Sequence, residues 1–241
     1  MKRKALLICN NGAGGATHDI DKWQNFLLSG EGGVWERTEI SLCVNPSRIE
    51  LLKAINIIKA SGFDFVLVAF AGHGEWKRST ILEINPSGES ISESEFNNLA
   101  PREIVCLDCC RGISRIAESA TEVQLRMFSA NQKAYLRQIY DSRMMQAVPQ
   151  IVKLYACQVG ESAYGDNDGG FYTNNLIDKA SDFLPNTNFQ TVVRAHNLAS
   201  TLTTNETWIK VGEPQHPDIV EARCAAQNQL IIGINAGIYR L

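Results

Sequence analysis

The sequence lacks the features that mark membrane-spanning, secreted and nucleic-acid-binding proteins. No apolar run approaches the roughly 20 residues of a membrane span, and the apolar stretch 5–9 is too short for the core of a signal peptide. The formal net charge is only −3, and no basic run forms a footprint for nucleic acid or an anionic membrane. We therefore expect no membrane partner and no direct nucleic-acid partner.

The seven cysteines do not follow the even count and regular spacing of a disulfide framework. Reduced thiols in a cytoplasmic protein are therefore expected, and a secreted protein with one unpaired cysteine is the alternative. What is present suits a globular protein. The 241 residues are 44% hydrophobic and 20% charged, which is enough to bury a substantial core.

Short apolar runs alternate along the chain with segments of helical periodicity. This alternation predicts an α/β fold with a mainly parallel sheet that is covered on both faces. We expect a single domain over residues 1–241, in which the polar segment 113–150 forms a helix and an exposed connection between 1–112 and 151–241. The expected strands are residues 5–9, 38–44, 63–70, 104–107, 151–156 and 230–234.

Reactive side chains follow two of the predicted strands. His73 lies in AGHGE after the run 63–70, and Cys110 lies in DCCRG after the run 104–107. Ligands bind outside the carboxyl ends of strands in an open parallel sheet, so neighbouring strands would bring imidazole and thiol to one crevice. There the imidazole makes the thiolate accessible and then protonates a leaving amine. His73 and Cys110 are therefore the candidate catalytic pair.

The glycines around His73 fit the same hypothesis. Gly72 and Gly74 allow the backbone to turn tightly and leave room for a substrate. The N–H of Gly74 is a candidate to join the N–H of Cys110 as an oxyanion hole, the pair of donors that stabilises a tetrahedral intermediate.

Other interpretations of these residues remain open. A lone His after a strand is often a hydrogen-bonded structural residue, and Cys106 and Cys109 suit a buried core. A zinc or redox site at Cys106-x-x-Cys109 is disfavoured, because a strand would direct the two side chains to opposite faces and no second ligand pair follows. A bridge between the adjacent Cys109 and Cys110 would be strained. We expect neither a metal nor a cofactor.

The order of strand, Gly-His-Gly, strand and Asp-x-Cys-x-Gly resembles the caspase clan, and most closely its metacaspase and bacterial orthocaspase members. The caspase signature is Q-A-C-[RQG]-G with an upstream His. DCCRG keeps its Cys, Arg and Gly but begins with Asp, as metacaspase-type motifs do, and this selects Cys110 over Cys109 as the nucleophile. Further similar stretches are ALLIC with ATHDIDKWQNFL, which has Asp19 at the family's usual acidic position, YACQVGESAYGDNDGGFYTNNL, and EPQHP.

The resemblance implies a caspase-type three-layer α/β/α sandwich with a central sheet of about six strands, a large-subunit-like half 1–112 and a small-subunit-like half 151–241. It also implies a cysteine endopeptidase that acts on a protein or peptide substrate. In metacaspase relatives the Asp of Asp-x-Cys lines the specificity pocket and selects Arg or Lys, so Asp108 predicts a basic preference. The alternative for Asp108 is a strand-end residue that caps local amides.

The rest of the pocket is implied by the same resemblance. A second acid is expected, but Asn10 and Asn11 occupy the place after the first strand, and Asp166 or Asp168 are the substitutes. Many metacaspases need calcium, although the short turn Asp166-Asn-Asp168 does not predict a calcium site. The opposite wall is expected from Ala156, Cys157, Ser162, Ala163 and Tyr164.

Several hypotheses remain open for how the protein is regulated and for whether it is an active protease. Self-cleavage within 113–150 is one, and a solvated helical face is its alternative. Relatives of this size imply a regulatory partner or sensor in a bacterial defence or cell-death pathway. A non-catalytic binding or scaffold domain and another thiol chemistry, such as an acyltransferase, are the competing functions. The candidate self-cleavage positions are Arg115, Arg126, Lys133, Arg137 and Arg143.

Overall fold

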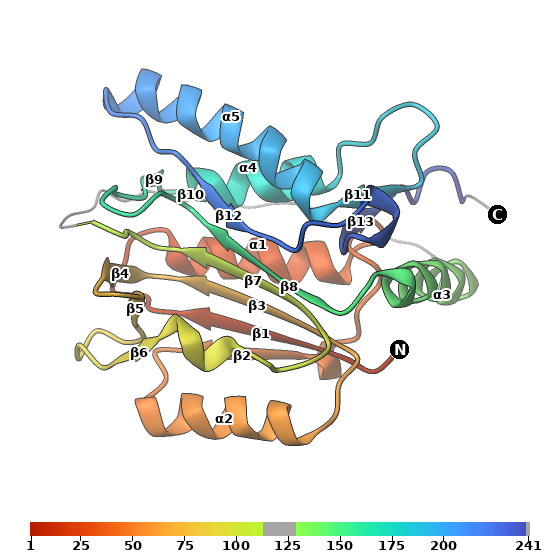
Figure 1. Ribbon diagram of the computed structural model, residues 1–241, viewed down its shortest axis with the longest axis horizontal. Coiled ribbons are helices and arrows are strands. Elements are labelled where there is room, and N and C mark those ends of the chain that lie inside the picture. Colours follow the sequence, from red (N-terminus) through yellow and green to blue (C-terminus); the bar gives the residue numbers. More distant parts are fainter. Residues whose placement is uncertain (113–128, 240–241) are drawn as a thin grey trace.

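A computed structural model describes residues 1–112 and 129–239 of the protein (Figure 1). Its centre is a six-stranded sheet of order β12-β8-β7-β3-β1-β2, in which β12 is antiparallel to β8 and all other neighbours are parallel. The prediction of a mainly parallel sheet of six strands is confirmed. These strands are β1 (Arg3–Cys9), β2 (Ile40–Val44), β3 (Phe65–Ala71), β7 (Arg102–Asp108), β8 (Gln150–Tyr155) and β12 (Asp218–Val220).

Helices cover both faces of the sheet and complete the three layers (Figure 1). Successive side chains of a strand point to opposite faces, so β1 contributes Leu7 and Cys9 to one core and Leu6 and Ile8 to the other. One face carries α1, α4 and α5, and the other carries α2. The helices are α1 (Ala16–Leu28), α2 (Arg48–Ala60), α3 (Ala130–Gln146), α4 (Phe171–Ala180) and α5 (Val192–Val211).

The last predicted strand belongs to a different sheet from the one expected. Residues 230–234 contain β13 (Ile231–Ile234), which pairs with β11 (Phe189–Thr191) in a separate two-stranded sheet. The sixth place in the central sheet is taken by β12, a strand of three residues, DIV. A strand this short shows no alternation of polar and apolar residues in the sequence, and therefore only the pairing with β8 identifies it.

Two small sheets flank the carboxyl ends of the central strands (Figure 1). The first continues directly from β3 and contains β4 (His73–Trp76), β5 (Thr80–Glu83) and β6 (Ser90–Ser92). The second is a short hairpin of β9 (Gly165–Asp166) and β10 (Gly169–Gly170), which leads into α4. Both lie where the candidate catalytic residues are placed.

The segment 113–150 contains the expected helix, α3, which buries Leu136, Tyr140 and Met144. Arg115 and Arg126 lie outside the described residues. The other basic candidates for self-cleavage lie in α3, where Arg137 pairs with Glu39 and Arg143 donates to backbone carbonyls. Arg143 is buried and Arg137 is held in an ion pair, so neither belongs to a freely solvated helical face. No helix in the described part of the chain is long and apolar enough to cross a membrane.

Candidate active site

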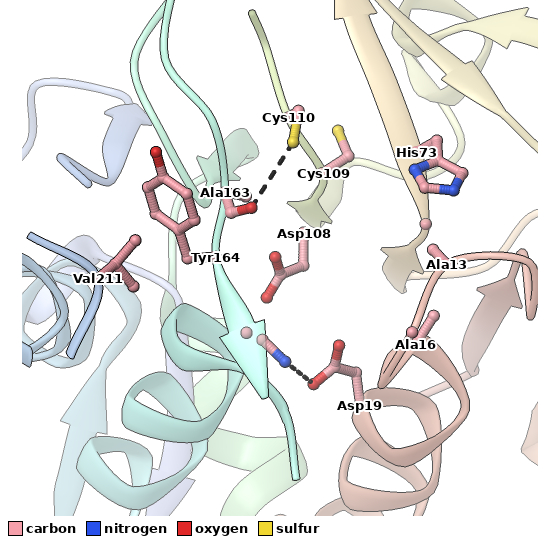
Figure 2. Close-up of a pocket in the computed structure, with 14 residues that line it drawn as sticks. Ala13, Ala16, Asp19, His73, Asp108, Cys109, Cys110, Ala163, Tyr164 and Val211 are labelled. Carbon is pink, nitrogen blue, oxygen red and sulfur yellow. Dashed lines mark hydrogen bonds between the residues drawn. The ribbon is translucent and has the colours of Figure 1, made fainter. Parts of the chain in front are cut away.

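A cavity of about 250 Å³ opens at the carboxyl ends of β1, β3 and β7, which are neighbours at the centre of the sheet. Figure 2 shows that its lining residues come from segments far apart in the sequence. This is the place where open parallel sheets bind ligands. The lining includes Ala13, Gly14, Ala16, Asp19, Gly72, His73, Asp108, Cys109, Cys110, Ala163, Tyr164, Gly165, Gly170 and Val211.

The register of β3 and β7 brings His73 and Cys110 to this cavity. Ala71 is paired with Asp108 at the ends of the two strands, and the N–H of Gly72 extends the pairing with a 3.1 Å bond to the carbonyl of Asp108. His73 and Cys110 are each two residues beyond the paired positions. The condition that the two strands be neighbours is therefore met, and both side chains line the cavity.

The Cys110 thiol points away from the imidazole. Its Sγ donates to the carbonyl of Ala163 at 3.6 Å, and Figure 2 shows His73 beyond Cys109 in that view. Burial raises the pKa of Cys110, and the charge of Asp108 adds to this effect, although hydrogen bonds with Ala163 and Ser162 oppose it. Among the described residues no hydrogen bond joins Cys110 to His73. In this geometry the sulfur is a thiol at neutral pH.

Cys109 and Cys106 lie in different cores, as alternation along β7 requires. Cys106 belongs to the core under α1 and α4, whereas Cys109 belongs to the core under α2. Burial raises the pKa of both thiols well above the ordinary value of a cysteine. Cys109 lines the cavity but is almost fully buried, and Cys106 lies in the other core, so the two thiols do not form one end of a metal site.

Two buried carboxylates form the deep part of the cavity. Asp108 Oδ2 accepts hydrogen bonds from the backbone N–H and the hydroxyl of Thr173, at 3.1 and 2.6 Å. Asp19 Oδ1 accepts from the N–H of Gly170 at 2.9 Å (Figure 2). Gly170 precedes α4 and Thr173 lies in its first turn, so both carboxylates face the positive end of a helix. The donors to Asp108 are thus 65 positions away in the sequence and are not local amides, and Asp108 also lines the cavity.

The two carboxylates affect each other. Burial raises the pKa of Asp108, although its bonds to Thr173 oppose the shift. Burial also raises the pKa of Asp19 well above the ordinary value, and the nearby charge of Asp108 raises it further. Two negative charges that are buried close together repel each other, so this part of the cavity favours the binding of a group with a positive charge between them.

The carboxylate that shares the cavity with Asp108 is Asp19, and not one of the two acids that the sequence suggested. Neither Asp166 nor Asp168 lines the cavity, since Asp166 pairs with Lys210 at 3.4 Å and caps the N–H of Asp168. The sequence points to Asp19 in two ways, since Asp19 has the family's usual acidic position and interrupts the buried face of α1 between Ala16 and Trp23. No three His, Cys, Asp or Glu side chains in residues 1–112 and 129–239 are grouped to hold a metal ion.

The opposite wall is only partly the one expected. Ala163 and Tyr164 line the cavity, and Ser162 contacts Cys110. Ala156 and Cys157 are instead fully buried behind that wall. Cys157 Sγ donates to the carbonyl of Glu161 at 3.3 Å and lies 3.5 Å from that of Cys109. Val211, at the end of α5, is a lining residue that the sequence pattern did not indicate.

Comparison with protein families matches residues 2–222 to the family described as the caspase domain. This chain belongs to the caspase-domain family. The match covers every lining residue named above. Family members are cysteine proteases, and the position of the thiol and imidazole at adjacent strand ends agrees with that chemistry.

Solved structures share the caspase fold at low sequence identity. Caspase-1 from Spodoptera frugiperda is 12% identical, with a TM-score of 0.58 over 91% of this chain and 86% of that one. Protein GSU0716 from Geobacter sulfurreducens is also 12% identical, with a TM-score of 0.56 over 95% and 97% of the two chains. The structure of pro-sf-caspase-1 is 10% identical, with a TM-score of 0.52 over 91% and 90%. A search of curated proteins finds no match.

Gly74 of this caspase domain packs too closely against the cysteine pair to accept a side chain. A Cβ at this position would lie 2.6 Å from Cys109 Sγ and 2.8 Å from the carbonyl oxygen of Cys110. We expect Gly74→Ala to lower the free energy of unfolding by about 1–3 kcal/mol, because an overpacked core must shift. Chemical denaturation measures this, with alkylation of Cys110 by iodoacetamide as a local probe.

Gly237→Ala is the matched control for Gly74→Ala. Gly237 is exposed, and its added Cβ would meet nothing closer than Asn235 Oδ1 at 3.4 Å. This substitution should change the free energy of unfolding by no more than about 0.5 kcal/mol. Equal stability of the two variants would contradict the close packing of Gly74 against the cysteines.

Proposed function

We propose that this caspase domain is a cysteine endopeptidase that cleaves peptide bonds after Arg or Lys. The observation that carries the proposal is the composition of one cavity. It holds the thiol of Cys110 and the imidazole of His73 at its mouth, and the carboxylates of Asp19 and Asp108 below them. The first pair supplies acyl-transfer chemistry, and the second recognises a positive charge.

In the proposed reaction His73 accepts the proton of the Cys110 thiol. The sulfur attacks the carbonyl carbon of the scissile bond, and the new C–S bond forms as the carbonyl becomes an oxyanion. The N–H groups of Gly74 and Cys110 are the proposed donors to that oxyanion. His73 returns the proton to the leaving amine as the C–N bond breaks. Water then hydrolyses the thioester and regenerates the thiol.

The acid pair is proposed to select the residue before the scissile bond. A guanidinium presents a planar fork of donors that matches carboxylates, and its charge relieves the repulsion between Asp19 and Asp108. An acidic side chain would instead add a third negative charge to a buried site. The pocket therefore favours Arg or Lys and disfavours Asp.

The direction of the thiol supports regulation of the proposed protease by a partner or sensor. Attack requires Cys110 Sγ to leave the carbonyl of Ala163 and approach His73. A partner that favours the second arrangement would activate the enzyme, because a ligand shifts an equilibrium toward the state that it binds better. The same observation favours a second candidate function, a catalytically silent binding domain.

A panel of fluorogenic peptides ending in Arg, Lys or Asp tests the proposal. We expect turnover after Arg and Lys and none after Asp. Turnover only after Asp would retain the protease and contradict the role of the acid pair. A peptidyl acyloxymethyl ketone ending in Arg provides a second readout in the same samples. Labelling of Cys110 without turnover would indicate a missing activator, and neither labelling nor turnover would support the silent binding domain.

A further inference from the structure

Gln215, in the EPQHP segment, is a fully buried polar residue that touches the back of the candidate site. Its side chain joins two backbone groups that are far from it in the sequence. Oε1 accepts from the N–H of Tyr164 at 2.8 Å, and Nε2 donates to the carbonyl of Ala156 at 2.7 Å. An amide provides a donor and an acceptor on one rigid plane, which a carboxylate or an aliphatic side chain does not.

The N–H that Gln215 holds belongs to the same peptide unit as the carbonyl that faces Cys110. The Ala163 carbonyl accepts from Cys110 Sγ, and the next atom along the chain is the Tyr164 nitrogen. The peptide unit is planar and trans, so its carbonyl and N–H point in opposite directions. A bond that fixes the N–H therefore fixes the direction of the carbonyl. Gln215 thus determines which group the cavity wall presents to the sulfur.

Gln215 is itself held firmly by α5. Its backbone N–H donates to the hydroxyl of Thr207 at 2.9 Å, and its carbonyl accepts from the hydroxyl of Thr204 at 2.7 Å. Both threonines lie in α5, a helix of 20 residues. Through Gln215, the cavity wall at Tyr164 is therefore anchored to a long helix and does not depend on its own loop alone.

The next residue, His216, holds the same loop at a second point. The backbone N–H of His216 donates to Glu161 Oε2 at 2.9 Å, and its Nδ1 lies 2.7 Å from Glu161 Oε1. The loop is in turn paired with the chain that follows the nucleophile. The N–H of Arg111 donates to the carbonyl of Glu161, and the N–H of Gly160 donates to that of Arg111, both at 3.0 Å.

We propose that Gln215 and His216 are positioning residues that orient the 161–164 wall against Cys110, and that Gln215 does so by fixing the 163–164 peptide plane. This inference rests on the proposed function for its kinetic consequence. Neither side chain touches the reacting atoms, and both act through the loop. Without Gln215 the 163–164 peptide plane is free to rotate, and the wall no longer presents a fixed surface to a bound peptide.

The test compares Gln215→Leu with Gln190→Leu. Gln190 is equally buried and also bridges backbone carbonyls, with its Nε2 at 2.7 Å from that of Lys179 and 2.9 Å from that of Asp182, but it does not line the cavity. Hydrogen exchange of the Tyr164 amide, thermal unfolding, and kcat and KM for an Arg peptide are measured for both variants. His216→Ala, which alters a partly exposed side chain, is included in case Gln215→Leu does not fold.

We expect Gln215→Leu to speed exchange of the Tyr164 amide at least about tenfold and to lower kcat/KM about 100-fold, as a displacement near 1 Å does. Gln190→Leu should lose thermal stability but keep kcat/KM within about threefold of the wild type. His216→Ala should raise KM about three- to tenfold with little change in thermal stability.

Two results would overturn the positioning role. One is unchanged exchange of the Tyr164 amide in Gln215→Leu. The other is an equal loss of kcat/KM in Gln215→Leu and Gln190→Leu, since this would show only a general effect on the fold. If Gln215→Leu does not fold, an unchanged KM in His216→Ala overturns it. Exchange is read without substrate, so a wild type that neither cleaves the peptides nor is labelled at Cys110 contradicts the proposed function while the exchange data still decide the role of Gln215.

Discussion

Cys110→Ala is expected to abolish cleavage of Arg-terminated peptides, with a loss of about 10⁴-fold or more in kcat/KM. The thiolate forms the covalent bond to the substrate, and the other thiol that lines the cavity, Cys109, is buried in the core under α2. His73→Ala should lower kcat/KM about 10²- to 10⁴-fold, because it removes the group that moves the proton. Steady-state kinetics on the fluorogenic Arg peptide measures both losses.

Cys109→Ala is the matched control for Cys110→Ala. The two thiols are adjacent in sequence, but Cys109 is buried in the core under α2. Removal of its sulfur leaves a small cavity and should lower stability by about 1 kcal/mol while peptide cleavage continues. Activity that survives Cys110→Ala and disappears with Cys109→Ala would identify Cys109 as the nucleophile and exclude the proposed pair of Cys110 and His73.

The second large effect concerns the acid pair. Asp19→Asn and Asp108→Asn should each lower kcat/KM for Arg and Lys peptides about 10- to 150-fold, the equivalent of a charge-assisted hydrogen bond of about 1.5–3 kcal/mol. The double substitution should remove the preference for basic residues. Competition between Arg, Lys and Gln peptides measures the preference directly. Asp166→Asn is the control. Asp166 lies in the β9–β10 hairpin beside the cavity but does not line it, so its substitution should leave the preference unchanged.

The pH dependence of cleavage follows from the raised pKa values. Burial raises the pKa of Asp108, and burial and the charge of Asp108 raise that of Asp19. Recognition of a cation needs ionised carboxylates, so KM for the Arg peptide should rise as the pH falls and the carboxylates take up protons. Because both pKa values are raised, this rise in KM should begin at a higher pH than it would for aspartates with ordinary pKa values. Asp108→Asn removes the charge that acts on Asp19, and the acidic limb of its remaining activity should move to lower pH.

Stability should change in the opposite direction from activity. A carboxyl whose folded-state pKa is raised stabilises the fold while it is protonated, and this contribution is lost as the pH rises through the folded-state pKa. Asn keeps an oxygen acceptor for the donors of Gly170 and Thr173 and removes a buried charge. Both Asn variants are therefore expected to be as stable as the wild type, or more stable, at neutral pH. A large loss of thermal stability would mean that the carboxylates serve the fold and not recognition.

Much of the fold was predictable because the information is local. The run 63–70 is apolar almost throughout, which is typical of a strand buried on both faces. The position of His73 and Cys110 at strand ends was predictable for the same reason. The start of α2 is also a local feature, because the helix begins at Arg48 after a capping box of Ser47 and Glu50.

The pairing of distant segments was not predictable from local patterns. β12 and β13 are both short and close together in the chain, and nothing in their composition shows which of them joins β8. Asp19 carries a weak local signal, but its partner Asp108 is 89 positions further along the chain, as the two residue numbers show. Only the order of the strands, with β1 and β7 on either side of β3, places the two carboxylates in one cavity.

The sequence by itself determined an α/β protein with a histidine and a thiol at the ends of two central strands. It did so because burial on both faces selects apolar runs, and reactive residues follow those runs directly. The tertiary structure decided that Asp19 and Asp108 line one cavity, that Cys110 faces Ala163, and that Gln215 bonds to the wall behind it. These are contacts between residues far apart in the chain, and they exist only once the strand order and the loop paths bring their backbones together.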